Sequence, residues 1–125
     1  MNYLLVFLGG GLGAMARHGI SGVSLRLWGI GFPFGTLAVN IVGSLLMGVL
    51  VEHFALRSGI PAATRLFLTT GVLGGFTTFS AFSLEAVLLY QRGQTAAAAM
   101  YVLASTVLSI AGLVAGMALV RTIAA

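Results

Sequence analysis

The sequence predicts an all-α membrane protein with four transmembrane helices in a single domain, residues 1–125. Hydrophobic residues make up 59% of the chain and charged residues only 6%, whereas about 25% of a soluble domain is charged. The mean hydropathy is +1.11. Polar segments divide the chain into four apolar blocks, at residues 3–23, 33–51, 66–90 and 95–120. Since a span needs about 20 residues, these blocks account for nearly the whole chain.

The first block, residues 3–23, contains Arg17 and His18 toward its far end. It lacks the basic start and the small-residue cleavage site of a secretory signal, so we expect a retained helix. Arg17 has two interpretations. It extends to the membrane interface, or it attracts anions at the mouth of a path through the protein. We expect an interfacial position with some electrostatic steering at a pore mouth.

The second block, residues 33–51, carries a polar stripe. Thr36, Asn40 and Ser44 are spaced four residues apart and therefore share one helical face. An asparagine inside a membrane needs partners for both its carbonyl and its amide group. Asn40 either joins two helices by hydrogen bonds or contacts a passing ion, and its position alone does not decide between them.

The third block, residues 66–90, contains the pair Gly74-Gly75. We expect this pair to break the third helix and to release backbone carbonyls that no amide satisfies. With the hydroxyls of Thr77 and Thr78 nearby, such carbonyls are typical ligands of a hard cation such as Na⁺.

Phe79 and Phe82 follow at the spacing of one helical face. Two phenylalanines so spaced commonly pack in a core. Their alternative is to present ring edges, the positive part of the aromatic quadrupole, to a small anion. Glu85 comes three residues later, and a carboxylate within a membrane indicates a functional residue. Glu52 and His53 stand at a helix end, where we expect them to be solvated.

The fourth block, residues 95–120, carries a second polar stripe. Tyr101, Ser105 and Ser109 are again four residues apart. A single serine in a membrane helix usually bonds to a carbonyl of its own helix. Three hydroxyls on one face indicate either this local bonding or a polar pathway along the helix.

The arginines predict the orientation of the chain. With four spans, both termini lie on one side of the membrane. The six arginines then fall in two equal groups: Arg57, Arg65 and Arg121 with the termini, and Arg17, Arg26 and Arg92 opposite. An excess of Lys and Arg in cytoplasmic loops orients a membrane protein. With a balanced count there is no such excess, so the charges do not favour one orientation. We therefore expect insertion in both orientations, unless one terminal charge decides.

Four short helices fill the centre of their own bundle with side chains. An ion path therefore requires more than one copy of the chain. Together with the balanced arginines, this favours an antiparallel homodimer with its two-fold axis in the membrane plane. Small residues suited to close helix packing occur in three blocks, at Gly9, Gly10, Gly11, Gly13, Gly43, Gly48, Gly112 and Gly116.

Three segments resemble, in order, the signature blocks of the CrcB/Fluc fluoride ion channels. They read GGLGAMARH at residues 10–18, GTLAVNIVGS at 35–44 and GGFTTFSAF at 74–82, and the resemblance covers nearly the whole chain. It implies a dual-topology homodimer with two antiparallel pores in the cell inner membrane or plasma membrane. It also implies passive fluoride efflux, which relieves cytoplasmic fluoride toxicity, and a central structural Na⁺ at the dimer interface.

The resemblance further implies roles for individual residues. The fluoride pathway would contain Asn40, Phe79, Phe82, Tyr101, Ser105 and Ser109, with Thr36 and Glu85 near it. The Na⁺ ligands would be the backbone carbonyls of Gly74 and Thr77. His18 and Ala81 depart from the family pattern, since an aromatic residue and a threonine are more common there.

Two other function classes fit less well. A small proton-coupled multidrug-type antiporter also has four helices, but it works through a carboxylate in the first helix, and this chain has no acidic residue before Glu52. A passive membrane scaffold would explain the glycines but not the polar stripes. We expect no enzymatic activity, and the scattered arginines do not suggest a nucleic-acid partner.

Overall fold

The computed structural model describes residues 1–124, and all regular structure in this range is helical. The elements are α1 (Asn2–Trp28), α2 (Phe34–Leu56), α3 (Ala62–Leu66), the π-helix η1 (Phe67–Leu73), α4 (Gly74–Phe76), α5 (Ser80–Gln91) and α6 (Thr95–Ala124). Four stretches are long and apolar enough to cross a membrane: Asn2–Trp28, Phe34–Leu56, Ala62–Gln91 and Thr95–Ala124. The prediction of four spans is confirmed.

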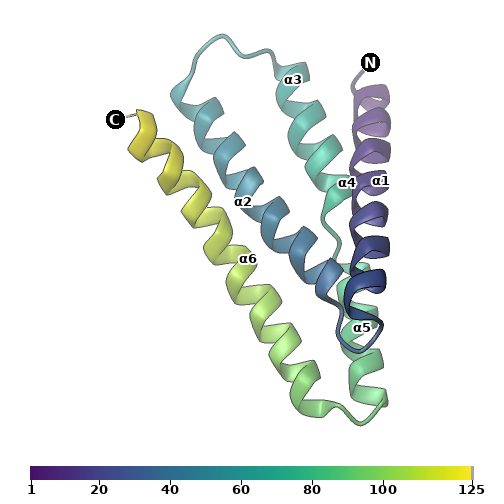
Figure 1. Ribbon diagram of the computed structural model, residues 1–125. Coiled ribbons are helices and arrows are strands. Elements are labelled where there is room, and N and C mark those ends of the chain that lie inside the picture. The colour runs from purple at the N-terminus through teal and green to yellow at the C-terminus, as the bar shows by residue number, and fades with distance from the viewer. Residues whose placement is uncertain (125) are drawn as a thin grey trace.

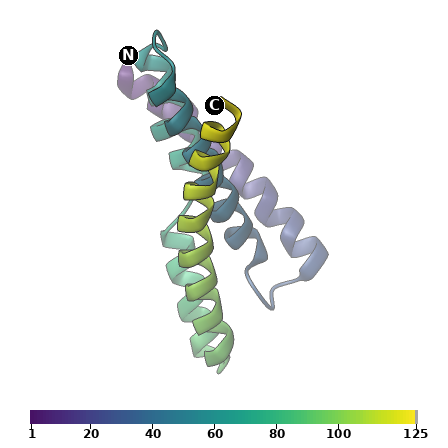
Figure 2. The same ribbon diagram turned by 90° about the vertical axis from the view of Figure 1, so that its left-hand side faces the viewer.

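The spans form an open arrangement rather than a closed bundle. Helices α2 and α6 lie side by side along most of their length (Figure 1), and the two chain ends lie at the same end of the molecule. The third span changes neighbours on its way. Its first part, η1 and α4, packs on α1, whereas α5 packs on α6. Figure 2 shows α1 diverging from α6 toward the lower end of the molecule.

Short connections join the spans. Gly29 follows α1 with a φ of 71°, and Gly93 turns the chain between α5 and α6 with a φ of 80°. Residues with a side chain rarely adopt a positive φ, whereas glycine does so readily. Pro33 and Pro61 precede α2 and α3, where a missing backbone N–H costs no helical hydrogen bond.

Glycines bring α1 into backbone contact with the third span. A Cβ atom on Gly13 would overlap the Val72 carbonyl and lie 2.7 Å from the Phe76 nitrogen, and one on Gly75 would overlap the Gly10 carbonyl. Such close approach is how helices associate where lipid removes the hydrophobic drive between them. Gly11, in contrast, meets nothing within 4 Å.

Glycines also allow close contact between α2 and α6. A Cβ atom on Gly48 would overlap the Leu113 carbonyl, and one on Gly116 would overlap the Leu45 carbonyl. These contacts bring the backbones of α2 and α6 close together in the half of the pair that lies toward the C-terminus. Gly43 meets the Thr77 methyl group, which brings α2 against the middle of the third span.

The third span leaves the helical path later than predicted. Gly74 and Gly75 are helical within α4, whereas Thr77 is extended, with φ −83° and ψ 159°, and the helix resumes at Ser80. The prediction that Gly74-Gly75 itself breaks the helix is therefore wrong in position by about three residues. These two glycines serve the contact with α1, and the preceding turns are a π-helix, a form frequent at functional sites.

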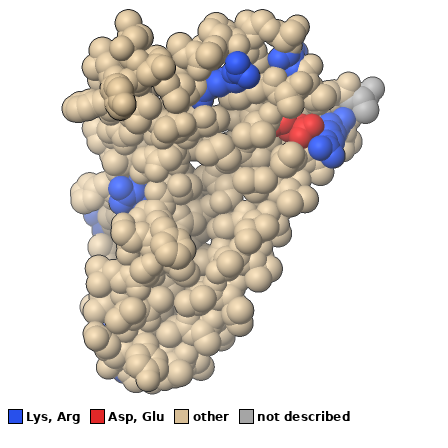
Figure 3. All heavy atoms as spheres, turned by 180° about the vertical axis from the view of Figure 1, so that it is seen from behind, with Lys and Arg blue, Asp and Glu red and all other residues tan. Residues whose placement is uncertain are grey.

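The end of the α2–α6 pair carries an ion pair. Arg121 Nε donates to Glu52 Oε1 at 2.9 Å, and Glu52 is only 6% exposed. In Figure 3 the acidic group lies against a basic one at the edge of a face that is otherwise mostly uncharged. The expectation that Glu52 is solvated is wrong. Because α6 packs along α2 it covers the carboxylate, and a buried carboxylate needs a charged partner.

Candidate functional site

Asn40 holds the interruption of the third span. Its Nδ2 donates to the Thr78 carbonyl at 2.9 Å, and its Oδ1 accepts the Thr78 N–H at 2.8 Å. One side chain thus replaces the helical partners of both backbone polar groups of Thr78. An asparagine amide has two N–H groups, so a second N–H is left to donate elsewhere.

The side chain of Thr78 in turn bonds to the first turn of α5, which begins at Ser80. Its Oγ1 accepts the Ala81 N–H at 3.1 Å and lies 3.3 Å from Ser80 Oγ. This is the geometry of a helix N-cap. The interruption is therefore built by the polar groups of Asn40 and Thr78. A threonine next to the start of a helix is a known capping signal, so the sequence could have indicated this role of Thr78.

The two backbone carbonyls that are predicted to bind Na⁺ lose their helical partners at this point. The amide that would bond the Gly74 carbonyl is that of Thr78, which donates to Asn40 instead. The amide that would bond the Thr77 carbonyl is that of Ala81, which donates to Thr78 Oγ1. Gly74 is exposed and Thr77 half-buried. Hard oxygen donors without hydrogen-bond partners suit a cation such as Na⁺, so the residues fit the predicted group.

A cavity of about 320 Å³ lies beside the interruption, between α2, the third span and α6. Five of the residues predicted for the fluoride pathway line it: Asn40, Phe79, Phe82, Ser105 and Ser109. Within residues 1–124, the hydroxyls of Ser105 and Ser109 are buried and have no hydrogen-bond partner. Buried hydroxyls are rarely left unpaired. The cavity therefore contains two donors that no acceptor of the described chain satisfies.

Neighbouring hydroxyls behave differently. Thr106 also lines this cavity, but its Oγ1 donates to the Val102 carbonyl of its own helix at 2.6 Å. This is the local bonding expected of an isolated hydroxyl. Ser44, the last member of the α2 stripe, lines the cavity too, and its spacing from Asn40 was the signal for it.

An aromatic pair, Phe79 and Phe82, forms part of the wall of this cavity. Phe82 is 9% exposed and packs against Tyr101, with ring centroids 5.2 Å apart. Phe79 is 78% exposed, and its ring centroid lies 5.5 Å from that of Phe82. Phe82 therefore belongs both to a core cluster and to the cavity wall, while Phe79 stands at the open side.

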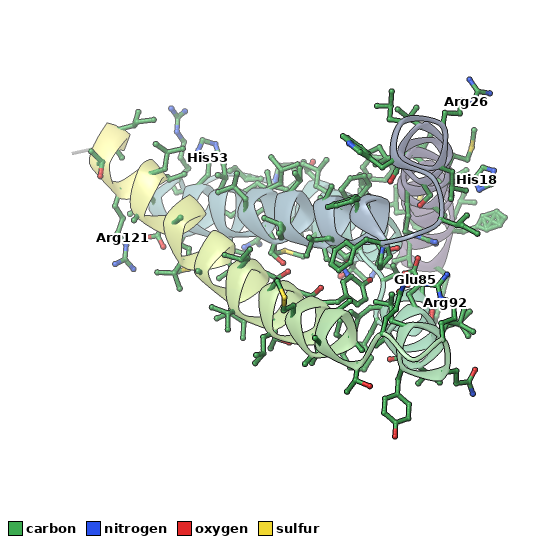
Figure 4. All side chains as sticks on the ribbon, turned by 60° about the horizontal axis from the view of Figure 1, so that its bottom comes forward. His18, Arg26, His53, Glu85, Arg92 and Arg121 are labelled. Atoms are coloured by element: carbon green, nitrogen blue, oxygen red, sulfur yellow. The ribbon has the colours of Figure 1, made fainter. Side chains whose placement is uncertain are left out.

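A second cavity, of about 330 Å³, lies beyond the aromatic pair, and Thr36, Glu85 and Arg92 line it. Tyr101 connects to it, since its hydroxyl donates to Glu85 Oε1 at 3.2 Å. Figure 4 shows Glu85 and Arg92 near each other at α5, while His18 and Arg26 point outward from α1. The predicted polar residues are thus divided between two cavities, with Phe82 and Tyr101 between them.

Arg17 contacts the end of α4, just before the interruption. Its Nε donates to the Gly75 carbonyl at 3.2 Å, and the residue is half-buried. Arg17 lies about 22 Å from the start of α1, at 1.5 Å per residue, and so it is not at an end of the helix. Gly9, Gly13 and Arg17 share one face at a spacing of four, a signal for this contact that the sequence analysis did not use.

The family model described as CrcB-like protein, Camphor Resistance (CrcB), matches residues 4–117. The chain belongs to the CrcB-like family. The matched range contains every candidate site residue, from Arg17 to Ser109. It also contains both cavities and the interruption between α4 and α5.

Curated relatives of this CrcB-like chain are named fluoride-specific ion channel FluC. One from Rhodopseudomonas palustris (strain BisB5) is 59% identical over 123 residues, covering 98% of this chain and 99% of the relative. One from Granulibacter bethesdensis is 57% identical over 98% of this chain and 97% of the relative. One from Agrobacterium fabrum is 54% identical over 98% of both.

Proposed function

We propose that this CrcB-like protein is a fluoride-selective ion channel. It lets fluoride leave the cell passively across the inner or plasma membrane and so reduces cytoplasmic fluoride toxicity. The names of its relatives support this function. The structural observation that carries it is the pair of buried, unpartnered hydroxyls of Ser105 and Ser109 in the cavity beside Asn40 and the two phenylalanines. The protein acts as a transporter of ions and not as an enzyme.

The chemistry of the cavity suits a small, strongly hydrated anion. A selective pore must replace the water around the ion but bind it weakly enough to release it. The hydroxyls of Ser105 and Ser109 and the second N–H of Asn40 are neutral donors that accomplish this. The ring edges of Phe79 and Phe82 add weak positive potential without a full charge, so the anion is not trapped.

The pathway continues past the aromatic pair. Beyond Phe82, Thr36 and Glu85 line the second cavity, and the Tyr101 hydroxyl bonds to Glu85. Glu85 engages Tyr101, and Arg92 lies in the same cavity, which offsets the repulsion between a carboxylate and an entering anion. Arg17, bound at the interruption, adds positive potential to the first cavity from α1.

The channel is an antiparallel, dual-topology homodimer with two pores at its interface. The open arrangement of the spans supports this assembly, because the first cavity is not enclosed by one chain. Phe79, at 78% exposure, stands where a second copy would cover it. The near balance of arginines between the two ends of the chain favours insertion in both orientations.

A structural Na⁺ would be held in this dimer by the Gly74 and Thr77 carbonyls of each copy. Both carbonyls have lost their helical hydrogen-bond partners within the described residues. When bound, the ion neutralises the partial negative charge of these carbonyls and ties the two copies together.

A proton-coupled antiporter is a weaker alternative. Such a protein needs a carboxylate that is free to exchange protons with its substrate. Both acidic side chains of this chain are engaged, Glu52 with Arg121 and Glu85 with Tyr101, and α1 contains none.

Ion efflux from liposomes tests the proposal. Proteoliposomes loaded with both fluoride and chloride should release fluoride down its gradient and retain chloride, as measured with ion-selective electrodes. Liposomes without protein are the control. Release that occurs only in exchange for protons or an organic cation would replace the channel by the antiporter, and equal release of chloride would remove the selectivity.

A further inference from the structure

Arg17 is a cation in the middle of a membrane span. A charged side chain at this depth is costly unless it is paired, and snorkelling to the interface is the usual escape. In the structure the guanidinium instead donates from Nε to the Gly75 carbonyl at 3.2 Å. Snorkelling therefore does not explain the position of the Arg17 side chain.

The packing of α1 directs Arg17 to this carbonyl. A Cβ on Gly9 would meet the Phe67 carbonyl at 2.8 Å, and Gly13, one turn later, touches Val72. Arg17 is the next residue on the same face, so it reaches the end of the helical run that finishes at Phe76. The C-terminal end of a helix carries partial negative charge and favours a cation.

The contact determines which carbonyls remain free. The Gly75 carbonyl lies in the chain between the two predicted Na⁺ ligands, the carbonyls of Gly74 and Thr77. Arg17 occupies the middle one, while the amides that would bond the other two are used elsewhere. Arg17 therefore withholds from a cation the Gly75 carbonyl that lies between the two predicted ligands.

We infer that Arg17 is a positioning residue that restricts the central cation seat to a monovalent ion, an inference that rests on the proposed Na⁺ site. A free Gly75 carbonyl would add one oxygen from each copy to the set, toward the about 6–8 oxygens that Ca²⁺ takes, and the hydrogen bond from Arg17 prevents this. The charge of Arg17 acts in the same direction, because it repels a divalent ion twice as strongly as a monovalent one.

Competition between cations tests this role. Purified full-length protein in detergent is equilibrated with radiolabelled Na⁺ and titrated with Ca²⁺. In the unmodified protein, Ca²⁺ should displace little Na⁺. In Arg17→Gln, which keeps an N–H donor but loses the charge, Ca²⁺ should compete at concentrations lower by about tenfold or more, the scale of one removed like-charge interaction. Arg26→Gln removes the same charge from the exposed end of α1 and should behave like the unmodified protein.

The outcomes separate the role of Arg17 from the cation site itself. Unchanged exclusion of Ca²⁺ in Arg17→Gln overturns the inference and leaves the Na⁺ seat standing. Absence of Na⁺ binding in the unmodified protein removes both, whereas fluoride efflux would remain a separate result. If Arg17→Gln does not fold, Arg17→Lys decides, since a lysine retains the charge and must still exclude Ca²⁺.

Discussion

At the scale of the residue, hydrogen bonding distinguishes side chains that the sequence treats alike. Ser105, Thr106 and Ser109 all lie on α6 and all line the first cavity. Thr106 bonds to a carbonyl of its own helix, whereas the two serines leave their hydroxyls without a partner in the described chain. The two serines therefore keep a hydrogen-bonding capacity that Thr106 uses within its own helix.

Removing these hydroxyls should separate stability from transport. We expect Ser105→Ala and Ser109→Ala to reduce fluoride efflux by about five- to tenfold each, because one hydrogen bond contributes about 1 kcal/mol. Thermal stability should stay the same or rise, since an unpaired buried hydroxyl is lost. Thr106→Val is the matched control and should leave efflux unchanged. Equal effects of all three substitutions would exclude a specific role for the serines.

The two phenylalanines also differ at this scale. Phe82 is buried against Tyr101, while Phe79 is exposed in the single chain. Replacing either with Ile should lower fluoride flux while the dimer still forms, because the ring edge is lost in both. Phe82→Ile should in addition lower stability by about 1 kcal/mol, the worth of an aromatic pair. Efflux assays and thermal unfolding measure the two effects, and normal flux in both variants would contradict an aromatic role.

At the scale of the element, the third span is two half-helices with different neighbours. Its first part is held on α1 by glycine contacts, and α5 is held on α6. Asn40 and Thr78 join the halves across the interruption. The interruption is thus maintained by helix packing on both sides and not by the flexibility of Gly74-Gly75.

Glycine substitutions test this packing. Gly13→Ala should lower the unfolding free energy by about 1–3 kcal/mol, the usual cost of overpacking, because its Cβ would overlap the Val72 carbonyl. Gly11→Ala lies on the same helix with nothing within 4 Å and should be neutral or slightly stabilising. Denaturation in detergent compares them, and equal stabilities would show that α1 and the third span are not in tight contact.

At the scale of the whole molecule, the exposed apolar surface and the distribution of arginines both bear on how copies of the chain insert and associate in the membrane. The chain leaves many large apolar side chains exposed, and they face lipid or a second copy. The arginines at the helix ends number three beside the termini and two opposite, with Arg17 between them at the interruption. This difference is small, so the prediction of dual insertion stands as it did from the sequence.

A reporter on the C-terminus tests the orientation. We expect a protease-cleavable tag to be accessible from both sides of the membrane, because neither end of the chain has a strong excess of arginine. Gln94→Arg adds charge to the end opposite the termini and should alter the ratio of the two orientations. A single orientation of the unmodified protein would contradict the dual-topology dimer.

The sequence by itself determined the four spans, the family and the polar stripes that contain Asn40, Ser105 and Ser109. These features depend on hydropathy and on helical spacing, which are local properties of the chain. Only the tertiary structure decided where the third span leaves the helix, which partner Arg17 takes and why Glu52 is buried. The hydrogen bonds and ion pair responsible join residues 38, 58 and 69 positions apart. Inside a membrane, without water as an alternative partner, the segment that packs against a polar group determines its bonding.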